Sequence, residues 1–191
     1  MGTLMGALRT PRDTWVEEGL RAFAEGGADA VRIEALAKSM GVTKGGFYGY
    51  FRDRESLLEA MLDKWEQEST DAVLELISDE GDPRTRIQRA GRLTFSNDRL
   101  RPIDLAVRNW ARHDERVAER LRRVDSRRME LLREMIGALC TDPDEVEARS
   151  LLAFCLAIGE HFLAADHGSR ARSEVHSRAA AIILSADADR K

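Results

Sequence analysis

A local cluster of positive charge is the first feature of this sequence that could do chemistry. The chain carries a formal net charge of -4, from 30 Lys and Arg against 34 Asp and Glu. Residues 32–54 nevertheless hold five cations and two anions. The cations are Arg32, Lys38, Lys44, Arg52 and Arg54. Because such side chains bind phosphate oxygens, any surface that attracts a polyanion should be confined to this stretch. The negative net charge of the chain as a whole argues against a protein that coats nucleic acid.

The other reactive side chains lack a spacing that would bring them together in a site. The 4 histidines show no metal-ligand spacing, and Cys140 and Cys155 are too few for a zinc site or a disulfide framework. No nucleophile elbow and no phosphate-binding loop after a strand occurs. We therefore predict no catalytic site, no metal and no cofactor. An all-helical enzyme that acts through a residue such as His161 is the rival interpretation.

Apolar residues recur at three-to-four spacing along the chain, which predicts an all-α fold of about nine helices. The expected helices cover residues 11–26, 33–40, 43–48, 53–77, a segment around 87–93, 103–110, 117–139, 143–168 and 170–184. Pro11 suits a first turn, Asp53 an N-cap, and Asp142 and Glu145 a capping box at the start of the eighth helix. No strand pattern appears in the sequence.

The second and third helices have the pattern of a helix-turn-helix. Two short helices cross tightly when the first places a small residue at the contact and the turn contains a glycine at positive φ. Ala37 and Gly41 meet these demands. Val42 and Phe47 are spaced to hold the second helix on the core, and Thr43 suits its N-cap, with a hydroxyl that accepts a backbone N–H.

The run from Ala37 to Glu55, AKSMGVTKGGFYGYFRDRE, closely resembles the head of the tetracycline-repressor (TetR) family. Phe23 and Gly27 lie at the matching upstream positions. The resemblance in motif covers about residues 23–62, roughly a fifth of the chain. Beyond it, only the length and the all-helical pattern agree with the family.

The resemblance implies a DNA-binding role for specific residues of the head. It makes Thr43, Tyr48 and Tyr50 hydroxyl donors to DNA phosphates, Arg54 a cation at the start of the fourth helix, and Lys44 and Gly45 the pair that faces the groove. Lys44 alone would read bases directly, through guanine acceptors. The alternatives are that the tyrosines are rim aromatics, that Arg54 is a solvated charge paired with a carboxylate, and that Lys44 is an ordinary surface lysine.

Two positions depart from the family pattern. Arg32 stands where the family usually has a Ser or Thr that caps the second helix, so Arg32 could contact phosphate instead. Gly46 stands where a Ser or Thr is common. A second glycine weakens the recognition helix by about 1 kcal/mol, which predicts that part of it orders only on DNA.

In the family, the rest of the chain binds an effector and forms a dimer. We expect a DNA-binding domain over residues 9–54 and an effector-binding and dimerisation domain over 55–191. The eighth helix is apolar nearly all round from Leu151 to Ile158, so it should be covered, as it would be in a homodimer formed through the last two long helices. The candidates for lining an effector pocket are Trp110, His113, Phe154 and His161. The arginines from 116 to 133 are interleaved with acids, which predicts a solvated face with local ion pairs within the helix.

These expectations describe a ligand-responsive repressor that binds a palindromic operator of double-stranded DNA as a dimer. Its partners would be the operator, a second copy of the chain and an unknown small-molecule effector. No apolar run reaches the roughly 18 residues that a membrane span needs, so we expect a cytoplasmic protein without a membrane partner. The rival from another class is a helical scaffolding or ligand-binding protein whose head contacts protein.

Overall fold

The computed structural model describes residues 10–77, 99–159 and 161–185, and this part of the chain contains helices and no strand. It has eight α-helices and one short 3-10 helix. They are α1 (Arg12–Gly26), η1 (Ala28–Ala30), α2 (Ile33–Ser39), α3 (Lys44–Phe47), α4 (Arg54–Ile77), α6 (Leu100–Ala111), α7 (Glu115–Gly137), α8 (Pro143–Gly159) and α9 (Arg172–Ile183). The predicted all-α class is confirmed, whereas the helix expected around residues 87–93 lies outside the described residues.

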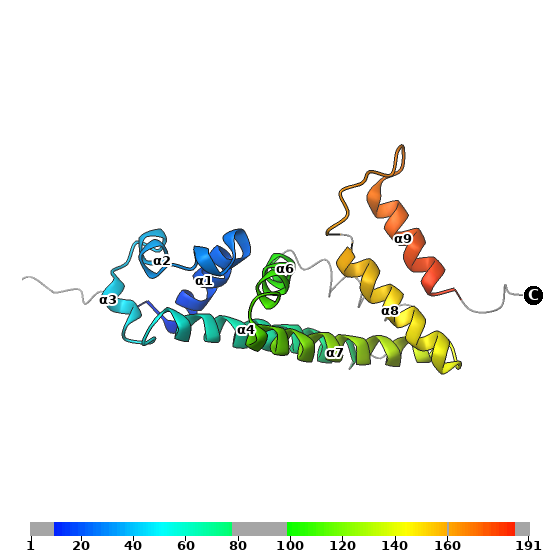
Figure 1. Ribbon diagram of the computed structural model, residues 1–191, viewed down its shortest axis with the longest axis horizontal. Helices are drawn as coiled ribbons and strands as arrows, with labels where there is room; N and C mark the ends of the chain where they lie inside the picture. Colours follow the sequence, from blue (N-terminus) through cyan, green and yellow to red (C-terminus); the bar gives the residue numbers. More distant parts are fainter. Residues whose placement is uncertain (1–9, 78–98, 160, 186–191) are drawn as a thin grey trace, which may run out of the picture. The chain divides into compact units, whose positions relative to one another are not determined.

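The helices form two compact units. The head unit comprises the described residues of 1–68 and 98–121, and the body unit comprises those of 69–97 and 122–191. Helices α4 and α7 each run from one unit into the other. In the head unit, α1, α2 and α3 gather beside the first turns of α4, and α6 packs on α1 (Figure 1).

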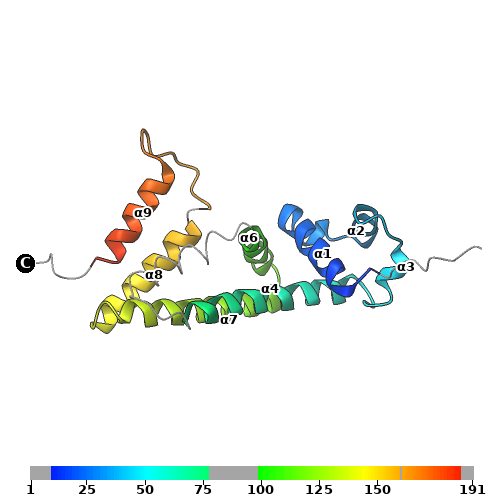
Figure 2. The same ribbon diagram turned by 180° about the vertical axis from the view of Figure 1, so that it is seen from behind.

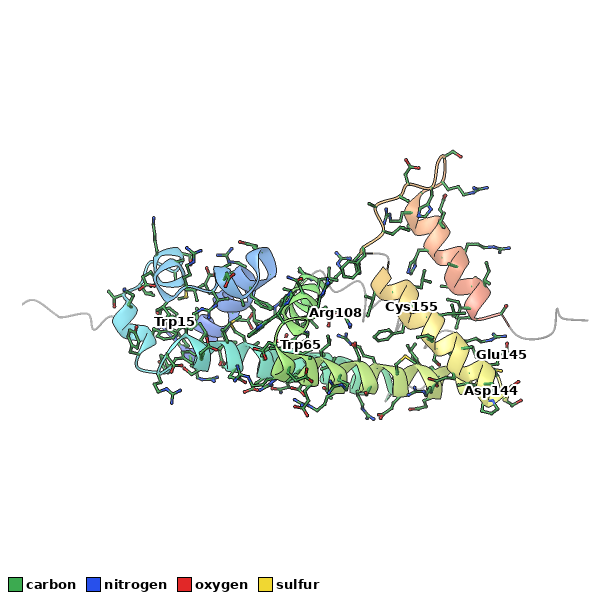
Figure 3. The ribbon with its side chains drawn as sticks, viewed as in Figure 1. Trp15, Trp65, Arg108, Asp144, Glu145 and Cys155 are labelled. Carbon is green, nitrogen blue, oxygen red and sulfur yellow. The ribbon has the colours of Figure 1, made fainter. Side chains whose placement is uncertain are left out.

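The core of the head unit is built from large side chains on α1, α3 and α4. Trp15, Phe47 and Trp65 are fully buried, and Trp15 and Trp65 are labelled in Figure 3. The Trp15 and Phe47 rings meet edge to face at 5.3 Å, an arrangement that adds to the free energy of burial. The apolar residues that recur at three-to-four spacing along α4 are all buried: Leu57, Leu58, Met61, Leu62 and Trp65.

Side-chain caps mark where α4 and α8 begin. At α4, the Ser56 N–H donates to Asp53 Oδ1 at 2.9 Å and the Asp53 N–H donates to Ser56 Oγ at 3.2 Å. This reciprocal pair satisfies two amides that the first turn leaves unbonded. Asp142 accepts the Asp144 N–H at 3.0 Å before α8, as expected of an N-cap. Pro11 is the N-cap of α1, one residue before the predicted first turn.

In the body unit, α7, α8 and α9 pack around a cluster of apolar side chains. Its buried members are Leu131, Leu132, Met135 and Ile136 of α7, with Phe154 of α8 and Leu184 packed against them. Helices α8 and α9 lie side by side in both views (Figure 1, Figure 2). The last helix, α9, falls within its predicted range.

Helix α8 is shorter than the sequence suggests. We expected it to continue to Gly168, but it ends at Gly159, whose carbonyl accepts the N–H groups of Phe162 and Leu163 at 3.0 Å. Glycine has low helix propensity, which explains why the helix ends there. Gly168 instead lies in the following connection, with a φ of 65° that suits glycine.

The arginines of α7 do more than cover a solvated face. Arg120 contacts three carboxylates of α4: Glu59 at 2.9 Å, Asp63 at 2.7 Å and Glu66 at 3.1 Å. Its side chain is only 20% exposed. The expectation of local pairs within the helix was therefore wrong for Arg120, which holds α7 against α4 inside the head unit.

Candidate nucleic-acid interface

The turn between α2 and α3 has the geometry that the sequence predicts. Gly41 adopts a φ of 66°, in the left-handed region that residues with a Cβ avoid. Ala37 is buried and its carbonyl accepts the Val42 N–H at 2.9 Å. The chain therefore reverses tightly here, and α3 starts directly after the turn.

Helix α3 is a single turn that Phe47 attaches to the core. Phe47 is fully buried and its ring stacks on Phe51 with 5.2 Å between centroids. Val42, the other predicted anchor, is only half-buried. On the outer side, Thr43, Lys44 and Gly45 are exposed, so the helix presents its first turn to solvent.

Thr43 is the N-cap of α3, as predicted, with an extended φ of -89° and ψ of 149°. Its hydroxyl, however, makes no capping hydrogen bond to the amides of α3, Lys44–Phe47. The backbone carbonyl of Thr43 accepts the Gly46 N–H at 3.1 Å instead. The predicted position is confirmed and the predicted capping bond is wrong, because a one-turn helix is closed by its backbone.

Lys44 has a protein partner that the sequence did not indicate. Its Nζ lies 2.6 Å from Glu34 Oε1, and both side chains are more than half exposed. The hydrogen bond donated to Glu34 raises the pKa of Lys44, and the same bond lowers the pKa of Glu34. Lys44 is thus held at the surface by an acid of α2.

The two tyrosines differ in exposure. Tyr48 is 59% exposed, and the edge of its ring packs against Phe47 with 5.3 Å between centroids. Tyr50 is half-buried, and its N–H donates to the Phe47 carbonyl at 2.9 Å. An aromatic ring fixed by Phe47 restricts where the Tyr48 hydroxyl can reach, which suits a group that positions a phosphate.

The two predicted arginines both bond to backbone carbonyls. Arg32 precedes α2 as its N-cap and donates from Nε to the Asp29 carbonyl at 3.1 Å. Arg54 donates from Nε to the Val31 carbonyl at 2.8 Å and from Nη2 to the Ala28 carbonyl. These acceptors could not be found from side-chain types, because every residue has a backbone carbonyl.

The four effector candidates fall in different units. Trp110 and His113 belong to the head unit, and Phe154 and His161 belong to the body unit. The Trp110 ring packs edge-on against Phe23 at 5.8 Å, and Phe154 packs on the α7 cluster. His113 is exposed and His161 is half-buried. Core packing thus accounts for the two aromatic rings, and the pocket assignment stays a prediction.

The described residues were also compared with what a metal site and a membrane-spanning helix require. Among residues 10–77, 99–159 and 161–185, no three His, Cys, Asp or Glu side chains lie as a metal ion would need. None of the helices described there combines the length and the apolar character that crossing a membrane requires.

Comparison with known proteins supports the assignment of the head. Residues 16–61 match the family of bacterial regulatory proteins described as the tetR family. YuxN, an uncharacterized HTH-type transcriptional regulator of Bacillus subtilis (strain 168), is 28% identical over 82 residues. That match covers 43% of this chain and 28% of YuxN, so the chain matches under a third of this relative's length.

Solved structures resemble the chain over nearly its full length. PfmR, a TetR family regulator from Thermus thermophilus, has a TM-score of 0.66 and 18% identity, covering 89% of this chain and 96% of PfmR. AibR, solved with isovaleryl coenzyme A and operator DNA, has a TM-score of 0.64 and 15% identity, covering 90% and 97%. FadR of Bacillus subtilis, solved with stearoyl-CoA, has a TM-score of 0.65 and 13% identity, covering 92% and 98%.

At these identities the solved structures establish the fold alone. The head is identified independently, by the sequence match and by the turn geometry at Gly41. Residues 16–61 of this chain therefore match the tetR family of bacterial regulatory proteins, and the described residues share the all-helical fold of solved TetR-family regulators.

Proposed function

We propose that this chain is a DNA-binding transcriptional regulator, specifically a ligand-responsive repressor that binds a palindromic operator as a homodimer. The observation that carries the proposal is α3, a one-turn helix attached by buried Phe47 that presents Thr43, Lys44 and Gly45 to solvent. A major groove admits such a helix. The DNA-binding domain would be residues 9–54, with effector binding and dimerisation in 55–191.

Each exposed group of the head has a role in this proposal. Thr43, Tyr48 and Tyr50 would donate hydroxyl hydrogen bonds to phosphates and set the register of the head on DNA. Lys44 would leave Glu34 and bond guanine acceptors, while Gly45 allows close approach. Arg32, exposed beside α2, would add a phosphate contact.

Exposed apolar side chains support the dimer. Leu151 and Leu152 of α8 are 54% and 56% exposed, and Ile182 of α9 is 64% exposed. Large apolar side chains gathered on two adjacent helices are typical of an interface. We propose that these faces meet their counterparts in a second copy, so that two heads contact half-sites about 35 Å apart.

The proposed effector is a small molecule. AibR and FadR were solved with acyl-coenzyme A compounds, so acyl thioesters of short and long chain are the first compounds to screen. Trp110, His113, Phe154 and His161 are the proposed contact residues. Binding would displace α4 and lower DNA affinity, which requires about 1 to 3 kcal/mol of coupling. The proposal includes no catalytic step and places the protein in the cytoplasm.

The test is selection of bound sequences from a random DNA pool at physiological salt. The wild-type chain should enrich a palindrome. Lys44→Ala should weaken the base preference at one position in each half-site, with a loss of about 1 to 3 kcal/mol in discrimination between bases. Tyr50→Phe should weaken all sequences alike. Lys38→Ala, at the exposed lysine of α2, is the matched control. A pool without enrichment would refute the proposal.

The dimer can be tested through the two cysteines. Cys155 is exposed on α8 (Figure 3), and Cys140 is buried. A short thiol cross-linker should join two chains through Cys155, and Leu152→Glu should abolish both the cross-link and the dimer seen by light scattering. Cys155→Ser is the control for the site of reaction. A monomer at micromolar concentration would refute this part of the proposal.

A further inference from the structure

Arg54 connects the first turn of α4 to the segment that leads into α2. Its Nε donates to the Val31 carbonyl at 2.8 Å, and its Nη2 donates to the Ala28 carbonyl. The third nitrogen, Nη1, lies 3.1 Å from Glu55 Oε1. All three nitrogens therefore have protein partners, and the side chain is 34% exposed.

The two carbonyl acceptors belong to one short element. Ala28 begins η1, and Val31 is its C-cap, fully buried and one residue before the N-cap of α2. Val31 lies 23 residues before Arg54 in the sequence, and Ala28 lies 26 residues before it. The planar guanidinium reaches two separate acceptors in a fixed geometry, which an ammonium group cannot reproduce. Hydrogen bonds from a charged donor are also stronger than neutral ones.

We propose that Arg54 is a positioning residue: it holds the start of α2 in a fixed relation to the first turn of α4, and through α2 it orients α3. This inference rests on the proposed DNA-binding function and replaces the direct phosphate contact that the family resemblance implies for Arg54. Protein acceptors take three of the five guanidinium N–H groups, and the bonds to the Val31 and Ala28 carbonyls fix the direction in which the guanidinium points. The displacement of α4 that we propose for effector binding would then reach the helix-turn-helix through this side chain.

The first experiment uses the full chain without DNA, so it stands whether or not the DNA proposal holds. Hydrogen exchange is measured at the Arg32 amide, bonded to the Ala30 carbonyl, and the Leu36 amide, bonded to the Arg32 carbonyl. Arg54→Lys and Arg54→Gln should both speed exchange at these amides by roughly tenfold. Arg52→Gln, at an 86% exposed arginine two residues away, should leave exchange unchanged. Unchanged exchange in Arg54→Lys would overturn the proposal.

The second experiment separates positioning from phosphate binding and from mere loss of stability. Affinity for the selected operator and for scrambled DNA is measured over a salt series, well below the unfolding temperature. Both Arg54 variants should lose operator discrimination by about tenfold and keep the wild-type salt slope. Leu58→Ala, which removes a buried side chain of α4, should lower stability and keep discrimination.

The competing outcomes are distinct. A salt slope that falls by about 0.9 in Arg54→Gln and is retained in Arg54→Lys would identify a phosphate contact and overturn the proposal. Wild-type chain that binds no DNA would refute the proposed function, and the exchange experiment would still decide whether Arg54 holds the start of α2.

Discussion

Lys44 Nζ lies 2.6 Å from Glu34 Oε1, so the cation at the start of the recognition helix is paired with an acid of the preceding helix. Both side chains are exposed, with 52% and 67% of their surface accessible. An exposed pair of this kind contributes little to stability. Its consequence lies in binding, because any polyanion that reaches Lys44 competes with the Glu34 carboxylate for the ammonium group.

The first prediction follows from this competition. Glu34→Gln should strengthen binding to all DNA sequences, by up to about fivefold, because it frees Lys44 and removes a negative charge facing the phosphates. Fluorescence anisotropy with operator and scrambled duplexes measures the change. Glu25→Gln, which removes an exposed acid of α1 paired with Arg21, is the control. Weaker binding in Glu34→Gln would mean that Glu34 orients Lys44 for contact.

The second prediction concerns the glycine within the recognition helix. A Cβ added at Gly46 would lie 3.9 Å from Trp15 Cζ2, an ordinary van der Waals contact. Gly46→Ala should therefore raise the free energy of unfolding by up to about 1 kcal/mol, since alanine favours helix more than glycine. Urea unfolding measures this change.

The matched control for Gly46 is the glycine of the turn. Gly41 has a φ of 66°, and a Cβ added there would meet no atom within 4 Å. Gly41→Ala should therefore destabilise by about 1 kcal/mol or more through backbone strain alone. Equal effects of the two substitutions would contradict the geometry of the turn.

The third prediction is a pH dependence at the start of α4. The hydrogen bond from the Ser56 backbone N–H, followed by that from Arg52, lowers the pKa of Asp53. A lowered pKa means that the folded chain favours the carboxylate, so this contribution is present at neutral pH and is lost as pH falls through the lowered value.

Wild type should therefore be more stable than Asp53→Ala at pH 7, and the difference should shrink as the pH falls below about 4. Thermal unfolding followed by circular dichroism across that range measures it. Asp53→Asn, which keeps a capping oxygen without titrating, is the control. A difference that persists unchanged in acid would show that the ionised carboxylate does not cap α4.

The fourth prediction concerns Arg120 and its three carboxylates on α4. Arg120→Gln should lower the free energy of unfolding by about 1 kcal/mol, because Glu59, Asp63 and Glu66 then lose the partly buried cation that all three contact. Arg133→Gln breaks an exposed pair with Glu147 and should lower the free energy of unfolding by less than Arg120→Gln does. Guanidinium would screen the charges, so urea is the denaturant. Equal losses would mean that burial of Arg120 adds nothing.

Several parts of the head were predictable because their causes are local. Gly41 follows a short amphipathic segment and precedes Val42, and that spacing alone indicates the turn. Asp53 and Ser56 are three residues apart, so their reciprocal bonds form within one helical turn. The end of α8 was missed at Gly159 because an apolar pattern continued beyond it.

The partners of Lys44 and Arg54 were not predictable in the same way. Lys44 meets Glu34 across a turn, and Arg54 bonds carbonyls on a separate element. Neither contact follows from helical periodicity, because it depends on how two helices cross. The Thr43 hydroxyl is a smaller example: its position is local, but the bond that closes α3 is made by the backbone.

By itself, the sequence determined the all-helical class, the turn at Gly41, the buried anchor at Phe47 and the cap at Asp53. Each of these depends on backbone preferences and on periodic burial within a few residues. Only the tertiary structure decided that Lys44 is paired, that Arg54 holds the start of α2 and that Arg120 joins α7 to α4. A long charged side chain pairs with whichever opposite charge or carbonyl lies within its reach, and the way the helices pack determines which groups those are.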